Sequence, residues 1–131
     1  AYCVDRVMHL LNQHKKAING AKVLMLGVSY KQDIDDYRES PAIRVYKELK
    51  AVGAEVEYFD PWVPEFKNMY GESGKSIPAL TPEVIASYDL IMVTCAHTNV
   101  DYEMVQRNAK AIFDTKNAMK NVCPRDNIEV L

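Results

Sequence analysis

The residues best suited to binding chemistry lie between positions 27 and 43, in the stretch GVSYKQDIDDYRESPAI. An aromatic ring and a cation are adjacent at Tyr30 and Lys31, and a second cation follows at Arg38. Aromatic rings stack on nucleobases, and lysine and arginine side chains pair with phosphate oxygens. The same stretch holds acids that could fix the cations or hydrogen-bond sugar hydroxyls: Asp33, Asp35, Asp36 and Glu39. This composition predicts a nucleotide site.

The glycine pattern of a dinucleotide site is missing from this stretch. A GxGxxG turn lets the backbone approach a pyrophosphate closely. Here only Gly27 is present, and the bulky residues Tyr30 and Lys31 follow it. We therefore expect a nucleotide with one nucleoside, rather than NAD, to bind at this place.

Alternating strands and helices must position these residues. Apolar runs predict strands over 22–30, 55–60, 89–95 and 110–114, with a short last strand at IEVL (128–131). Helical periodicity predicts helices over 2–18, 41–52, 81–88 and 101–109, and 61–80 is expected to be an irregular connection. The order predicts an α/β fold, a Rossmann-like doubly wound parallel sheet with a leading N-terminal helix. The stretch with Lys31 then leaves the carboxyl end of the first strand, where such sheets bind ligands.

Composition narrows the classes of partner. The 131 residues carry a formal net charge of −2 with acids and bases interspersed, which argues against nucleic acid or a membrane surface as the partner. No signal-peptide pattern is visible, and three cysteines without a CxxC pair predict reduced thiols in a cytoplasmic protein. No metal site is expected, because His9 and His14 have no ligand spacing to a cysteine or an acid.

The stretch LGVSYKQDIDDYRESPAI resembles the segment G-[LV]-[AST]-[FY]-K-x-[DN]-[TV]-[DG]-D-x-R-[ED]-S-P of the UDP-glucose/GDP-mannose dehydrogenase family. That segment opens the C-terminal, UDP-binding domain of the family. GAEVEYFDPWVP, SYDLIMVTCAHTNVDYEMV and AIFDTKNAMK extend the resemblance over nearly the whole chain. The DTKN ending and AHTNVDYEMV lean towards the UDP-N-acetyl-hexosamine 6-dehydrogenases rather than the UDP-glucose enzymes.

The resemblance implies the UDP-sugar-binding domain of an NAD-dependent nucleotide-sugar 6-dehydrogenase of polysaccharide biosynthesis, an oxidoreductase that oxidises the sugar C6 alcohol to a carboxylate. It implies UDP contacts at Tyr30, Lys31, Arg38 and Lys116. Lys116 stands where the family pattern has arginine, so it keeps the charge and loses the planar fork. No catalytic residue is expected in this chain, because NVCPRD around Cys123 lacks the glycines of the family's GGxCxPKD motif.

The resemblance also implies partners outside this sequence. NAD and the catalytic cysteine belong to N-terminal and central domains of a parent enzyme, which is expected to be a homo-oligomer. Residues 1–19 are then a connecting and dimerisation helix, and residues 20–131 are the UDP-binding Rossmann-like domain. Because the family associates through this helix, its apolar stripe at residues 4, 7, 8 and 11 is expected to form an exposed patch or to mediate self-association.

Two other classes remain open at this point. One is a stand-alone flavodoxin- or receiver-like domain whose clustered acids bind Mg²⁺, although the third strand ends in TCAH and offers no aspartate to phosphorylate. The other is a CoA- or NAD-binding Rossmann module, which the missing GxGxxG opposes. His97 is expected to pack or cap, since no partner acid is identifiable, and Asp60 is expected to cap the DPW turn.

Overall fold

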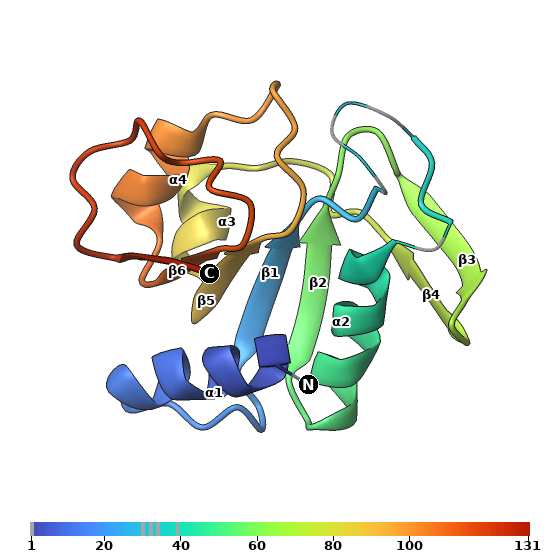
Figure 1. Ribbon diagram of the computed structural model, residues 1–131, viewed down its shortest axis with the longest axis horizontal. Helices are drawn as coiled ribbons and strands as arrows, with labels where there is room; N and C mark the ends of the chain where they lie inside the picture. The colour runs from blue at the N-terminus through green and yellow to red at the C-terminus, as the bar shows by residue number, and fades with distance from the viewer. Residues whose placement is uncertain (1, 30, 32, 34, 39) are drawn as a thin grey trace.

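Five parallel strands form a central sheet in the order β2-β1-β5-β6-β7 (Figure 1). Their bounds are Lys22–Leu26 for β1, Glu55–Phe59 for β2, Leu90–Val93 for β5, Ile112–Asp114 for β6 and Ile128–Val130 for β7. β1 lies between β2 and β5, with Val23 opposite Val56 on one side and Leu90 on the other. The carboxyl ends of these strands therefore meet at one edge of the sheet.

Helices cover both faces of the sheet. The computed structural model describes residues 2–29, 31, 33, 35–38 and 40–131. Helices α1 (Tyr2–Gln13) and α2 (Pro41–Ala51) pack into one apolar cluster, and α3 (Pro82–Ala86) and α4 (Tyr102–Asn108) pack into a second. Val23 and Met25 of β1 belong to the first cluster, while Leu24 and Leu26 belong to the second. Successive strand residues point to opposite faces, which explains the continuous apolar run.

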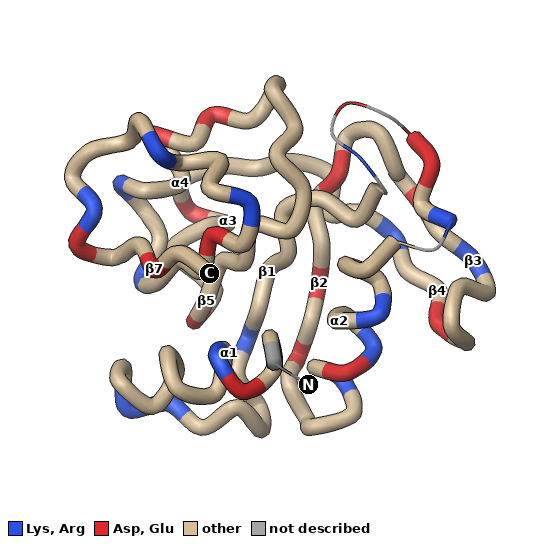
Figure 2. Tube along the Cα trace, viewed as in Figure 1, with Lys and Arg blue, Asp and Glu red and all other residues tan. Residues whose placement is uncertain are grey.

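The predicted α/β fold with a parallel sheet and a leading helix is confirmed. Thr81 accepts a hydrogen bond from the backbone N–H of Val84 at 3.2 Å and so caps α3. The predicted last strand exists as β7. Basic and acidic residues are interspersed along the described chain (Figure 2).

Two predicted boundaries are wrong. The first helix ends at Gln13 rather than near residue 18, because Lys15 takes a positive φ of 59° and turns the chain out of the helix. The first strand ends at Leu26 rather than at residue 30, where the backbone turns to bind Asp60, as described below. Segment 61–80 is also more regular than expected. It contains the antiparallel hairpin of β3 (Glu65–Met69) and β4 (Glu72–Lys75).

The expected exposed patch on the first helix is also wrong for most of its residues. Val4, Val7 and Leu11 are buried in the cluster that α1 shares with the sheet, and only Met8 is exposed. Arg6 fixes the same helix to β7 through Glu129, with its Nη2 2.7 Å from Glu129 Oε2. The stripe therefore contributes to this chain's own core. Among the described residues, none of the helices has the length and apolar character needed to cross a membrane.

Candidate nucleotide site at the strand ends

Gly27 begins the loop after β1 and shows why this turn is not a dinucleotide cradle. Its φ is 95°, and a Cβ at this position would collide with the Cβ of Cys95. The glycine therefore serves the close approach of the β1 and β5 ends, and it does not open space for a pyrophosphate. With no further glycine in the turn, its residues do not fit the pyrophosphate of NAD.

Asp60, directly after β2, anchors the next residues of the loop. Its side chain is fully buried, and its Oδ2 accepts the backbone N–H groups of Val28 at 2.8 Å and Ser29 at 3.1 Å. Its Oδ1 accepts the N–H of Trp62 at 2.8 Å, which confirms the predicted cap of the DPW turn. One carboxylate thus joins the ends of β1 and β2.

His97, after β5, has the partner acid that the sequence did not reveal. Its Nε2 lies 3.0 Å from Asp60 Oδ2, and because a carboxylate only accepts, Nε2 carries the proton. Its Nδ1 accepts the backbone N–H of Asp33 at 2.7 Å, which is the geometry of a neutral ring. The expectation that His97 packs without an acid is corrected, because the order β2-β1-β5 brings Asp60 and His97 together.

Two effects act in opposite directions on the charge of His97. Burial lowers the pKa of His97, whereas its hydrogen bonds with Asp60 and Cys95 raise the pKa by more. A second proton would have to go to Nδ1, where the amide of Asp33 donates and where Asp33 Oδ1 is 3.7 Å away. The amide donor favours the neutral form. The backbone N–H of Thr98 in turn holds the pKa of Asp33 below its ordinary value.

Ser29 connects this buried network to Lys31. Its hydroxyl donates to the carbonyl oxygen of Lys31 at 2.6 Å. Because that bond uses the only hydroxyl proton, its oxygen accepts from the other neighbours, His97 Nε2 at 3.2 Å and Cys95 Sγ at 3.4 Å. The hydrogen bond from Ser29 therefore links the backbone of Lys31 to the buried network.

Lys116 is placed by a second buried carboxylate. Asp114 ends β6, is fully buried, and accepts the N–H groups of Lys116 and Ala118 at 3.1 Å and of Met119 at 2.8 Å. Thr115 donates its hydroxyl to the carbonyl of Val93 at 2.7 Å, which ties this turn to β5. The DTKN segment is thus a fixed turn that presents Lys116 at the strand ends.

Lys31 and Lys116 line one cavity of about 360 Å³, called here the strand-end cavity. Its wall is made by residues from the ends of β1, β5 and β6, the start of α2, α1 and the last residue: Cys3, Ser29, Lys31, Ser40, Pro41, Ala42, Val45, Met92, Thr94, Thr115, Lys116 and Leu131. Two ammonium groups, hydroxyls and the amino end of a helix at one cavity favour an anionic ligand. The apolar wall residues suit the uncharged part of such a ligand.

The other predicted site residues lie differently. Arg38 does not line the strand-end cavity. Its exposed guanidinium pairs with Asp36 through Nε–Oδ1 at 3.1 Å and Nη2–Oδ2 at 3.2 Å. Hydrogen bonds from Arg38 lower the pKa of Asp36. Ser40 is the N-cap residue of α2, as expected, but its hydroxyl donates to the carbonyl of Ser29 instead of serving as a cap acceptor. Tyr30 lies outside the described residues.

Sequence reasoning missed Ser29, Asp114 and the pairing of Asp60 with His97. A usable signal was present, because each of these residues lies within four positions after the end of a buried strand, or ends one. In a parallel sheet such positions share one edge. The missing information was the strand order, which decides which strand ends are neighbours.

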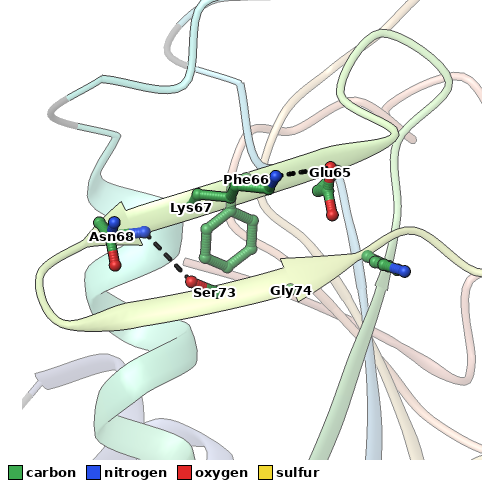
Figure 3. A pocket seen from close by; sticks show the side chains of 7 residues that line it. Glu65, Phe66, Lys67, Asn68, Ser73 and Gly74 are labelled. Atoms are coloured by element: carbon green, nitrogen blue, oxygen red, sulfur yellow. Dashed lines mark hydrogen bonds and ion pairs between the residues drawn. The ribbon is translucent and has the colours of Figure 1, made fainter.

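A separate hollow of about 350 Å³ lies on the β3–β4 hairpin (Figure 3). The ring of Phe66 lies between the two strands there, beside Gly74, where a Cβ would approach the ring to 2.9 Å. Phe66 also packs edge-on against Tyr46 at a centroid distance of 5.6 Å. The hollow follows from this aromatic packing, and we assign no site to it.

Comparisons with known proteins bear on the strand-end cavity. Residues 24–121 match the family model described as "UDP-glucose/GDP-mannose dehydrogenase family, UDP binding domain". That range includes both Lys31 and Lys116. The UDP-N-acetyl-D-glucosamine 6-dehydrogenase of Pseudomonas aeruginosa is 30% identical over 122 residues, which cover 88% of this chain and 28% of that protein.

A second relative and a solved structure agree with this match. The UDP-N-acetyl-D-mannosamine dehydrogenase of Methanocaldococcus jannaschii is 33% identical over 126 residues, covering 90% of this chain and 26% of that protein. The UDP-D-ManNAc dehydrogenase structure from Pyrococcus horikoshii superimposes with a TM-score of 0.75 over 98% of this chain and 29% of that chain; at 21% identity it bears on the fold alone. The chain spans about 28% of the length of the P. aeruginosa relative.

Proposed function

Because the chain belongs to the UDP-glucose/GDP-mannose dehydrogenase family as its UDP binding domain, we propose that the strand-end cavity holds the UDP part of a nucleotide sugar. The observation that carries this proposal is the convergence of Lys31 and Lys116 on one cavity from opposite parts of the chain. Two cations suit the charge of a diphosphate, and the amino end of α2 adds backbone amides to the same wall.

In this proposal Lys31 and Lys116 each place an ammonium group near the diphosphate or the sugar. Tyr30 is proposed to shape the adjacent part of the pocket. A ligand contact from Arg38 is also part of the proposal, but it would require the exposed Arg38 side chain to exchange its pairing with Asp36. The apolar wall at Ala42, Val45 and Met92 would face the less polar part of the nucleotide.

We further propose that the full-length enzyme is a cytoplasmic homo-oligomer that oxidises the C6 alcohol of a UDP-N-acetyl-hexosamine. The two relatives described above carry names of that substrate class. NAD would supply the hydride-accepting chemistry, and because the turn after β1 does not fit NAD, we place the cofactor and the catalytic cysteine in other parts of the enzyme. The three cysteines of this chain are free thiols, in keeping with a reducing compartment.

Separate titrations with UDP, NAD and Mg²⁺, followed by thermal unfolding, test the proposal. UDP should raise the melting temperature, because a ligand at a hundred times its Kd stabilises the native state by about 2.7 kcal/mol. Stabilisation by NAD without UDP would support a dinucleotide module instead. Stabilisation by Mg²⁺ alone would support the receiver-like alternative, for which the described residues offer no group of three or more metal-binding side chains.

A further inference from the structure

The ends of β2, β1 and β5 are joined beneath Lys31 by two side chains that do not line the strand-end cavity. Asp60 and His97 are at most 1% exposed, and their contact of 3.0 Å between Oδ2 and Nε2 lies behind the loop after β1. Neither Asp60 nor His97 lines the strand-end cavity. Their position raises the question of what this buried pair does.

Asp60 Oδ2 and His97 Nδ1 both accept hydrogen bonds from the loop that carries Lys31. Asp60 accepts two consecutive backbone N–H groups of the loop, at Val28 and Ser29. His97 accepts a third, at Asp33, two residues beyond Lys31. The loop is therefore held on both sides of the lysine by buried partners.

Ser29 provides the direct connection. It touches His97 through its hydroxyl oxygen, and it donates its proton to the carbonyl of Lys31. Other arrangements of this network are disfavoured, because breaking the bond from Val28 or Ser29 to Asp60 leaves a buried N–H without an acceptor. The described residues contain no buried side-chain nitrogen or oxygen that lacks a hydrogen bond.

We propose that Asp60 and His97 are positioning residues for Lys31: the buried pair fixes the loop after β1 so that the lysine reaches the anion in the strand-end cavity. This inference rests on the proposed UDP site. A lysine has four rotatable side-chain bonds, so its contribution to affinity depends on a fixed backbone from which the ammonium group reaches the ligand.

Two histidine variants separate the two halves of the network. His97→Asn keeps an acceptor near the position of Nδ1 for the Asp33 amide, and His97→Gln keeps a donor near the position of Nε2 for Asp60. Asp60→Asn has nearly the same shape as the native residue and lacks the charge that His97 pairs with. Tyr88→Phe is the control, because it removes a partly buried hydrogen bond to Glu57 at a residue that does not line the strand-end cavity.

The decisive experiment is a double-mutant cycle on UDP affinity, measured by calorimetry in the full-length dehydrogenase. Asp60→Asn should weaken UDP binding roughly threefold to tenfold, and no more than Lys31→Ala does. In the Lys31→Ala background, Asp60→Asn should have almost no further effect, because the contact that it positions is already gone. Tyr88→Phe should lower the melting temperature and leave the UDP affinity unchanged.

The outcomes distinguish the two proposals. If Lys31→Ala does not weaken UDP binding, the proposed site fails. If Lys31→Ala weakens binding but the effect of Asp60→Asn is absent or fully additive, the positioning role alone is overturned. Should Asp60→Asn not fold, the same cycle is run with the histidine variants. One of them should retain more affinity than the other in the native background, and that difference should vanish with Lys31→Ala. Equal differences in both backgrounds would refute the inference.

Discussion

Lys31 and Lys116 reach one cavity because a buried carboxylate holds the backbone of each loop. Asp60 accepts the N–H groups of Val28 and Ser29, and Asp114 accepts that of Lys116 itself and two that follow. Both carboxylates are fully buried. At the scale of residues, the proposed site therefore contains two exposed cations, each on a loop whose backbone is hydrogen-bonded to a buried carboxylate.

Lys116 offers a gain-of-affinity test, because the family pattern has arginine at this position. Lys116→Arg should tighten UDP binding by about twofold to tenfold, since the guanidinium fork can donate two hydrogen bonds to one phosphate. Lys116→Gln should weaken it. Calorimetry at low and high salt measures both, and the loss in Lys116→Gln should shrink as salt screens the charge.

Lys120→Arg is the control for this prediction, because Lys120 is exposed and does not line the strand-end cavity. Equal UDP affinity in the native protein, Lys116→Arg and Lys116→Gln would exclude Lys116 from the site.

At the scale of elements, the sheet order decides which residues meet. The apolar runs predicted β1, β2, β5 and β6, and the helical stripes predicted α2 and α4, all to within a few residues. Strands and helices that bury one or both of their faces leave a clear pattern of apolar residues in the sequence. The hairpin of β3 and β4 was missed, since its strands alternate poorly and lie among prolines and glycines. The contact of Asp60 with His97 was missed because no sequence period encodes strand order.

Gly27 joins two of these elements, and its replacement tests the reason for the glycine. Gly27→Ala should lower the free energy of unfolding by about 2–4 kcal/mol, because it combines a positive φ with a collision against Cys95. Gly71→Ala is the matched control, with a φ of 78° and no atom within 4 Å of the new Cβ. Urea unfolding measures both variants, and equal losses would show that the collision is relieved at no cost.

Replacement of Arg6 tests whether the contacts of α1 with the sheet stabilise this fold. Its guanidinium donates to Glu129 Oε2 at 2.7 and 3.1 Å and to the carbonyl of Val130 at 3.0 Å, and it lies 5.1 Å from the centre of the Phe113 ring. Arg6→Ala should lower the free energy of unfolding by about 1–2 kcal/mol. Arg107→Ala, at an exposed position of α4, should cost much less in the same urea titration; a similar cost would mean that the contacts of Arg6 add no stability.

At the scale of the whole molecule, the chain is the UDP binding domain of its family, and the sequence alone indicated as much through motifs spread along its length. The fold and the loop that carries Lys31 could be predicted because strand periodicity and the VSYK segment are local features. The convergence of Lys31 with Lys116 in one cavity depends on the packing of β1, β5 and β6, which no local pattern contains. Division into a connecting helix at 1–19 and a domain at 20–131 stays a prediction, although α1 packs on the sheet.

The chain by itself should be catalytically inert. Its turn after β1 does not fit NAD, and its sequence has no GGxCxPKD-like motif to supply the thiol nucleophile. Purified chain mixed with NAD and a UDP-N-acetyl-hexosamine should form no NADH by absorbance, while the full-length enzyme should. NADH formation by the 131-residue chain would refute the prediction that NAD and the catalytic thiol are bound elsewhere in the enzyme.

Lys31 carries the central claim, and calorimetry of UDP binding to the full-length dehydrogenase tests it most directly. A charge-assisted contact to phosphate contributes about 1.5–3 kcal/mol, so Lys31→Ala should weaken UDP binding roughly ten- to a hundredfold. Lys31→Arg should also lose affinity, because a planar fork does not fit a point-charge site unchanged. Lys47→Ala, at an exposed position of α2 outside the cavity wall, should bind UDP like the native protein. An unchanged UDP affinity in Lys31→Ala would contradict the account.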